Sequence, residues 1–418
     1  MRLSEHELAI QGGAFGEARR RALAIQTEIG RFFDADDFVE VSQAHIMADT
    51  ESLGEAGVQF LEELAQGPEE ETRVIVPTIT DPRGADFNAY QRINHDEAYV
   101  ALERRADQAF RALGVLMTDT CINYQTMMAP VRDEHLAMGD TGVTIYCNSV
   151  LGARTNYEGG PSALAAAMTG RTPRYGFHLD QHRRGTARFV VEYRPGDWAD
   201  WGALGGMIGR QMGSYFQVPV IEGIKGTGPA PTSDDLKHFG AALASFGSTA
   251  LFHMTGITPE APDLAAVFDG TPPDPVVITE ADFVQFMDEY GGADDQLDVV
   301  VFAAPQLSLL EMEKLAGLLK GKRLADGVAL LVATNPENKN ASDRMGLTET
   351  IEASGAVVLE GVCFYQMHAR ELGEANGWTR LMTNSAKLTN IIGGYGYEPT
   401  LGTMEGCVES AVAGRVVR

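Results

Sequence analysis

The amino-acid sequence predicts an α/β protein made of two or three lobes, each a parallel sheet flanked by helices. A chain of 418 residues, 44% of them hydrophobic, is too long to pack around one simple core. In its second half, strand-like and helix-like segments follow one another in strict turn. The strand-like segments are nearly continuous apolar runs, such as residues 328–333, which is typical of parallel strands covered on both faces.

The first half of the chain is less regular. Helical periodicity runs from about residue 5 to residue 25, with charged side chains along one side. The further elements expected here are a strand running into a loop over 38–45, a strand over 73–78, a helix over 96–113, a strand over 143–149, a glycine-rich loop over 152–161 and a helix over 162–170.

The second half alternates more strictly. We expect strands over 218–223, 249–256, 276–279, 298–305, 328–335 and 356–363, with helices over 234–246, from 281, over 308–320 and before 356. A segment rich in Pro, Gly and Asp near residues 270–275 favours a boundary there, so we divide the chain into 1–272 and 273–418.

Composition excludes several classes of function. With 58 acidic and 33 basic residues, the net charge is −25, which repels nucleic acid and anionic membrane surfaces. The longest apolar run is far too short for a membrane span, and the N-terminus shows no secretory signal. Four cysteines do not make a disulfide framework, so we expect a reducing, cytoplasmic location. The sequence also lacks a P-loop, an HExxH helix, a CxxC pair and a GxSxG elbow.

The densest polar segment runs from Cys147 to Pro173. Ligands bind beyond the carboxyl ends of strands in open α/β sheets, and the expected strand ends at Asn148 and Ser149. The guanidinium of Arg154 has the fork geometry that binds a carboxylate, and the neighbouring glycines allow a ligand to approach the backbone. The alternative is a helix-entry loop in which Arg154 points to solvent.

A second candidate segment covers residues 382–390. Ser385 is suited to cap a helix, which would place Lys387 in the first turn. A cation in that position is unfavourable against the helix dipole, so such a helix would aim the lysine at an anionic ligand. The alternative is an ordinary surface lysine.

Both segments resemble the aconitase X family. Residues 147–173 are similar to its NSVxGARTNxEGGPxALAAAxTGRTP signature, and TNSAK at 383–387 matches the same string in the family. Other landmarks recur in order: SQAHI with His45, VPTITDP with Asp81 where Asn is usual, TCINY with Cys121, and HMTGITPEA at 253–261. The similarity covers essentially the whole chain.

The resemblance implies a large subunit built like the first three domains of aconitase, without the swivelling domain. A small swivelling subunit would complete the site and supply a serine as the base. Known activities of the family are dehydration of cis-3-hydroxy-L-proline, which we favour here, and of 5-phosphomevalonate. The alternatives are an aconitase-like isomerase and a non-catalytic relative that binds a metabolite or a partner.

Removing water from a hydroxy acid requires a base, stabilisation of the developing negative charge, and help for the departing hydroxide. We expect Arg154, Lys387 and Ser385 to be catalytic. The residues expected to bind substrate are His45, Asp81, Asn148, Ser149, Thr155, Asn156, Glu158 and Asn384.

The cysteines raise the question of a cofactor. Cluster-bearing members of the family use three cysteines, of which the resemblance matches Cys121 and Cys363. Ala304 stands where the third is expected, and Gln306 stands where the family has histidine. Cys147 is a possible substitute, whereas Cys407 fits the buried face of the last helix. An iron–sulfur cluster, a single metal ion and a centre without metal all remain open, because a cluster normally needs three or four thiolates.

Overall fold

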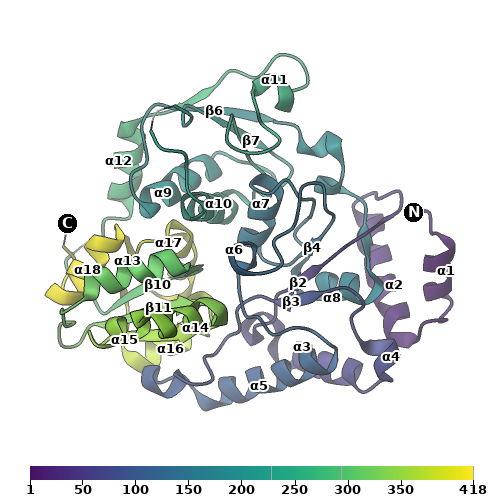
Figure 1. Cartoon of the computed structure of the whole chain (residues 1–418), viewed down its shortest axis with the longest axis horizontal. Helices are drawn as coiled ribbons and strands as arrows, with labels where there is room; N and C mark the ends of the chain where they lie inside the picture. Colours follow the sequence, from purple (N-terminus) through teal and green to yellow (C-terminus); the bar gives the residue numbers. More distant parts are fainter. Residues whose placement is uncertain (227, 293, 418) are drawn as a thin grey trace.

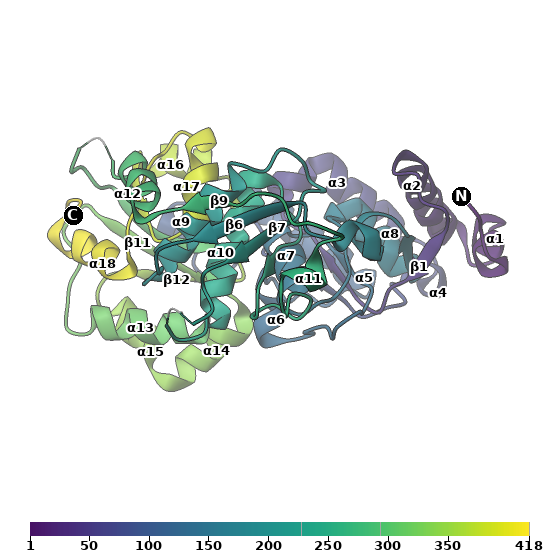
Figure 2. The ribbon, with the colours of Figure 1, turned by 90° about the horizontal axis from the view of Figure 1, so that it is seen from above.

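The computed structural model describes residues 1–226, 228–292 and 294–417. It shows three lobes in chain order, and the predicted α/β class with parallel sheets flanked by helices is confirmed. In Figure 1 the N-terminal lobe lies on the right, the middle lobe at the top and the C-terminal lobe on the left. Seen from above, helices α1 and α2 lie at one end of the long axis and the C-terminal lobe at the other (Figure 2).

The N-terminal lobe is built on a small parallel sheet of order β3-β2-β4. Its strands are β1 Phe38–Glu40, β2 Ala44–Ile46, β3 Thr78–Thr80, β4 Ala137–Met138 and β5 Arg171–Pro173. Its helices are α1 Glu5–Gln11, α2 Glu17–Phe32, α3 Thr50–Ala65, α4 Glu69–Thr72, η1 Tyr90–Ile93, α5 Glu97–Ala112, α6 Asn123–Thr126, α7 Thr141–Ser149, α8 Gly159–Thr169, η2 Gly176–His178 and η3 Asp180–Arg183.

The middle lobe carries a four-stranded parallel sheet of order β8-β7-β6-β9. Its elements are β6 Ala187–Val191, α9 Trp198–Gly209, β7 Pro219–Glu222, α10 Ser233–Gly247, β8 His253–Met254, α11 Leu264–Val267, β9 Val276–Ile278 and α12 Glu280–Glu289. The division expected between residues 272 and 273 falls inside this lobe, because β9 pairs with β6 although it lies after that point.

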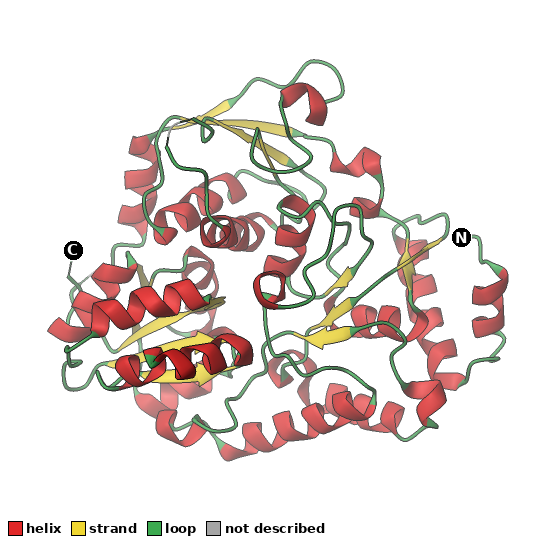
Figure 3. Cartoon of the chain, in the orientation of Figure 1, coloured by secondary structure: helices red, strands yellow, loops and turns green. Residues whose placement is uncertain are grey.

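The C-terminal lobe is a five-stranded parallel sheet of order β12-β11-β10-β13-β14 with helices on both sides (Figure 3). Its elements are β10 Val299–Leu307, α13 Leu309–Leu319, β11 Ala329–Thr334, α14 Pro336–Met345, α15 Leu347–Glu352, β12 Val357–Glu360, η4 Phe364–Gln366, α16 Ala369–Asn376, β13 Arg380–Thr383, α17 Ala386–Ile392, η5 Gly393–Tyr395, β14 Glu398–Leu401 and α18 Met404–Ala413. The expected strand and helix order is confirmed from β10 to β12, whereas strands β13 and β14 and helix α16 had no counterpart in the prediction.

The prediction of a strand over residues 143–149 is wrong, because these residues form helix α7. Three consecutive residues, Val143 to Ile145, have strand propensity, but the Asp140 side chain caps the segment by accepting a hydrogen bond from the backbone N–H of Val143. The residues from Gly142 to Ser149 are all buried, so the sequence shows no helical periodicity. Helix α7 packs against α10 in the centre of the molecule (Figure 1).

Three smaller expectations also differ from the structure. The helix expected over 5–25 is interrupted between α1 and α2, where Gly13 and Gly16 have φ values of 83° and 91° that favour glycine. The strand expected over 38–45 is two strands, since β1 pairs with β5 and β2 joins the parallel sheet. The strand expected over 73–78 begins only at Thr78.

No helix within residues 1–226, 228–292 and 294–417 combines the length and the apolar character that crossing a bilayer requires.

Candidate active site

Lys387 lies in the interior where the C-terminal and N-terminal lobes meet. Ser385 caps helix α17, as predicted, by accepting a hydrogen bond from the N–H of Leu388 at 3.1 Å, and its hydroxyl donates to the carbonyl of Ala304 at 2.5 Å. Lys387 therefore stands in the first turn, with its side chain only 4% exposed. The alternative of a surface lysine is excluded.

The partner of Lys387 is a residue that the sequence analysis missed. The Lys387 ammonium lies 3.6 Å from Asp140, whose side chain is 3% exposed at the start of α7. Burial works against the charge on Lys387, but the combined attraction of nearby groups, led by Asp140 and including Asp81, raises the pKa of the lysine. A Cβ at Gly142 would lie 3.0 Å from the Asp140 carboxylate and 4.0 Å from Lys387 Nζ, so the glycine leaves space beside the pair. In the sequence, Asp140 had only the pattern of an N-cap residue, which does not predict an ion pair with Lys387.

Asp81, directly after β3, and His45, in β2, form a second part of the same centre. His45 Nε2 lies 2.8 Å from the carbonyl of Thr120 and 3.7 Å from Asp81 Oδ1. Burial, followed by the nearby charge of Asp140, raises the pKa of Asp81 well above its usual range. Its Oδ2 accepts a hydrogen bond from Gln366, whereas Oδ1, 3.7 Å from His45, has no hydrogen-bond partner in the part of the chain that the structure describes. The centre thus holds a buried carboxyl group with one oxygen that accepts no hydrogen bond from the described residues.

Further buried acids surround this centre. Gln366 donates to Asp49 and to Asp81, both at 3.1 Å, and thereby links the two carboxyl groups. Burial raises the pKa of Asp49 to about 6 and that of Glu103 to about 8. Asn384 is also buried, and its Nδ2 finds no partner among the described residues. The interior is rich in acids and keeps unsatisfied polar atoms, as expected of a site that accepts a polar ligand.

The cysteines do not form a ligand set. Cys121 and Cys363 are buried, and burial raises the pKa of the Cys121 thiol to about 12. Cys147 lies in α7 within the hydrophobic core, and Cys407 is buried on α18, as expected. Nowhere in residues 1–226, 228–292 and 294–417 do three His, Cys, Asp or Glu side chains converge so that they could hold a metal ion. The residues present therefore do not fit an iron–sulfur cluster.

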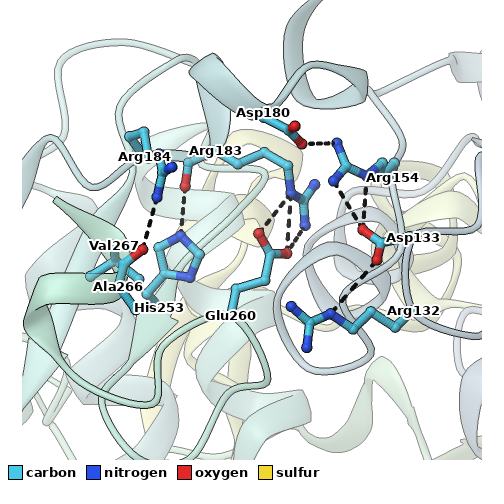
Figure 4. A pocket seen from close by; sticks show the side chains of 10 residues that line it. All are labelled: Arg132, Asp133, Arg154, Asp180, Arg183, Arg184, His253, Glu260, Ala266 and Val267. Carbon is cyan, nitrogen blue, oxygen red and sulfur yellow. Dashed lines mark hydrogen bonds and ion pairs between the residues drawn. The ribbon is translucent and has the colours of Figure 1, made fainter. Parts of the chain in front are cut away.

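Arg154 lies in another place, a surface pocket of about 220 Å³ (Figure 4). Its guanidinium lies 2.9 Å from Asp133 and 2.6 Å from Asp180, two exposed carboxylates that occupy its fork. Arg183 is paired with Glu260 in the same pocket. Lys387 and Asp140 do not line this pocket. The structure thus separates the two cations that the sequence predicts to act together.

The remaining predicted residues of this segment hold the chain itself in place. The Asn148 amide donates to the carbonyls of Thr155 and Ala250, both at 2.9 Å. The other three contacts join Ser149 to the N–H of Phe252, Asn156 to the carbonyl of Tyr175, and Glu158 to the hydroxyl of Thr172. The bonds to Ala250 and Phe252 connect the N-terminal and middle lobes, and the others lie within the N-terminal lobe. All of them give these side chains a structural use.

Comparison with known proteins agrees with this architecture. Models of the aconitase X first, second and third domains match residues 1–181, 185–288 and 297–413. The chain is 34% identical to the phosphomevalonate dehydratase large subunit of Methanothermobacter thermautotrophicus, over 94% of each chain. It is 30% identical to the cis-3-hydroxy-L-proline dehydratase of Pseudomonas aeruginosa, over 99% of this chain and 70% of that protein. The crystal structure of Thermococcus kodakaraensis aconitase X in its holo form superposes with a TM-score of 0.86 at 28% identity, covering 98% of this chain and 100% of that one.

Proposed function

The chain belongs to the aconitase X family, whose domain models match it in order along nearly its whole length, and from this premise we propose that it dehydrates cis-3-hydroxy-L-proline. Its relatives are named dehydratases, so the chain is a lyase of the hydro-lyase class. The observation that carries the choice of substrate is the buried Lys387–Asp140 pair within an acid-rich interior.

The charges of this interior suit a small zwitterion. Lys387 supplies one cation for a carboxylate, while Asp140 is a carboxylate suited to a ring ammonium. Asp49 and Asp81 add further acidic groups nearby. A hydroxyproline carries one carboxylate and one ammonium, and it therefore matches this set of charges.

The proposed reaction is an elimination across two adjacent carbons. A base removes the proton beside the substrate carboxylate, the electron pair forms the carbon–carbon double bond, and the hydroxyl group leaves from the neighbouring carbon. Lys387 pairs with the carboxylate and stabilises the negative charge that develops on it. Asp140 keeps Lys387 charged and oriented. We assign the base to a small swivelling subunit, since several relatives are named large subunits.

A second substrate, 5-phosphomevalonate, is favoured by the identity of 34% to an enzyme named for it. Its phosphate would need further cations. Arg154 and Arg183 pair with carboxylates in the surface pocket, and Lys387 is not among the residues that line that pocket. This charge distribution is the reason that we place hydroxyproline first.

A direct comparison of the two substrates tests the proposal. The chain and a family small subunit, alone and combined, are assayed with cis-3-hydroxy-L-proline and 5-phosphomevalonate. We expect turnover only by the combination, with kcat/KM at least about tenfold higher for the hydroxyproline. A preference for 5-phosphomevalonate would reverse the substrate assignment, and turnover by the chain alone would contradict the proposed source of the base.

A further inference from the structure

Residues 304–306 lie at the centre, near the carboxyl end of β10. Ala304 and Gln306 are both fully buried. These are the two positions at which the sequence departs from the cysteine and histidine of the family pattern. The hydrogen bonds of Gln306 show the structural consequence of having glutamine at this position.

Both the NH₂ group and the oxygen of the Gln306 side-chain amide form hydrogen bonds with the segments that carry Cys121 and Cys363. Its Nε2 donates to the carbonyl of Asp119 at 3.0 Å and to that of Val362 at 3.2 Å. Its Oε1 accepts a hydrogen bond from the backbone N–H of Cys121 at 3.3 Å. The backbone N–H of Gln306 donates to Cys121 Sγ at 3.4 Å. Val362 directly precedes Cys363. One amide therefore joins both cysteine segments.

The segment is also held from the other side. Lys237 donates to the carbonyl of Gln306 at 3.2 Å, and its ammonium is paired with Glu311 and with Asp234. Ser385 donates to the carbonyl of Ala304. Gln306 is therefore held in place from several sides and acts as a strut, by which we mean a fixed link between the segments of Cys121 and Cys363.

A third departure from the family pattern lies at the same centre. Asp81 stands where the family pattern has asparagine. Its Oδ1 is buried, lies 3.7 Å from His45 Nε2 and has no hydrogen-bond partner among the described residues, whereas its Oδ2 is held by Gln366. An asparagine amide cannot donate a proton to a leaving hydroxide, but a carboxylic acid can.

We propose that this centre works without an iron–sulfur cluster, with Gln306 as the strut between the cysteine segments and Asp81 as the proton donor to the leaving hydroxide. The carbon–oxygen bond breaks, its electron pair stays on the oxygen, and the Asp81 proton converts that oxygen to water. The proton removed from carbon goes to the base, and exchange with solvent restores both groups. The inference does not depend on which hydroxy acid is the substrate.

Metal analysis provides a readout that is independent of turnover. The complex of the chain with its small subunit is reconstituted anaerobically with ferrous iron and sulfide, desalted and analysed for both elements. We expect no more iron in the wild-type protein than in a Cys121→Ser control. Ala304→Cys/Gln306→His, which restores the family residues, should gain about 2 or more iron atoms with sulfide.

Two results would overturn the structural half of the inference. One is wild-type protein that keeps iron and sulfide which Cys121→Ser removes. The other is failure of the double variant, and of Ala304→Cys alone, to gain iron while each unfolds at a normal temperature, because the two residues would then not account for the missing cluster.

The pH dependence of turnover tests Asp81. Asp81→Asn should lower kcat about 10²–10⁴-fold and remove the fall in activity at high pH that follows ionisation of the acid. Asp81→Glu should restore part of the activity and that fall. An Asp81→Asn enzyme with wild-type kcat and an unchanged pH profile would rule out the proposed acid.

Discussion

Lys387 and Arg154 are both cations paired with carboxylates, but their surroundings differ. The Lys387 side chain is 4% exposed and its partner Asp140 is 3% exposed. Arg154 is 16% exposed, and its partners Asp133 and Asp180 are 62% and 81% exposed. In the interior, neither charge has water to replace a lost partner, whereas solvent screens the pairs of the pocket.

This difference indicates that a dense polar motif does not by itself mark the centre that we propose. The glycine-rich segment after α7 is fully used in holding its own loop and the middle lobe. The centre instead depends on single residues brought together from distant segments, such as Lys387 and Asp140. Four substitutions test this difference between buried and exposed charged groups.

Replacement of Lys387 should have the largest effect. Lys387→Met removes the cation that is proposed to stabilise the developing charge, so kcat should fall about 10²–10³-fold or more. It also leaves Asp140 buried without a partner, which lowers the melting temperature. In the double variant Lys387→Met/Asp140→Asn, the melting temperature should recover while activity stays lost. Recovery of activity in the double variant would show that the lysine has only a structural role.

Lys237 tests a buried charge to which the proposal assigns no part in binding or proton transfer. Lys237→Met leaves Glu311, whose side chain is 1% exposed, without its ammonium partner. We expect a loss of about 3–5 kcal/mol in the free energy of unfolding, measured in urea. The exposed pair of Arg105 with Glu62 is the control, since Arg105→Met should cost about 1 kcal/mol or less. Equal losses would remove the distinction between interior and surface pairs.

Glu103 tests the acidity of the interior through pH. Burial raises its pKa from 4.5 to about 8, so between these values the folded protein holds a proton that the unfolded chain releases. The stabilising contribution of the protonated form is complete below 4.5 and is lost as the pH rises through 8. The melting temperature should therefore fall over this range, and less steeply in Glu103→Gln. Glu62→Gln, at an exposed position, is the control, and an equal change in its slope would contradict this explanation.

Arg154 should show the smallest effect of the four. Arg154→Lys keeps a cation beside two exposed carboxylates, so we expect a loss of stability below about 1 kcal/mol and kcat/KM within about tenfold of the wild type. The measurement is steady-state kinetics of the complex with the small subunit. A loss as large as that of Lys387→Met would return Arg154 to the reacting centre, where the sequence motif first suggested it.

The sequence predicted the regular part of the fold and the identity of the family, but not the centre. The strands and helices from β10 to β12 have the expected order, because each apolar run is bounded by turn residues or caps. Helix α7 was missed because burial on all sides removes periodicity. The sequence pointed to Lys387 because a cation in the first turn of a helix is unfavourable, whereas Asp140 had only the pattern of an N-cap residue. The proposed role of Asp140 depends on its contact with Lys387, which lies 247 residues further along the chain, and no local sequence pattern predicts such a contact.

The polar contacts between lobes also limit how the protein can be recombined. Gln366 of the C-terminal lobe binds Asp49 and Asp81 of the N-terminal lobe, and Lys237 of the middle lobe binds Glu311 of the C-terminal one. A chimera that exchanges one lobe with a relative must carry both members of each pair, or it will bury an uncompensated group. Although three domain models match separate parts of the chain, we therefore expect its lobes to be exchangeable only together with their buried partners.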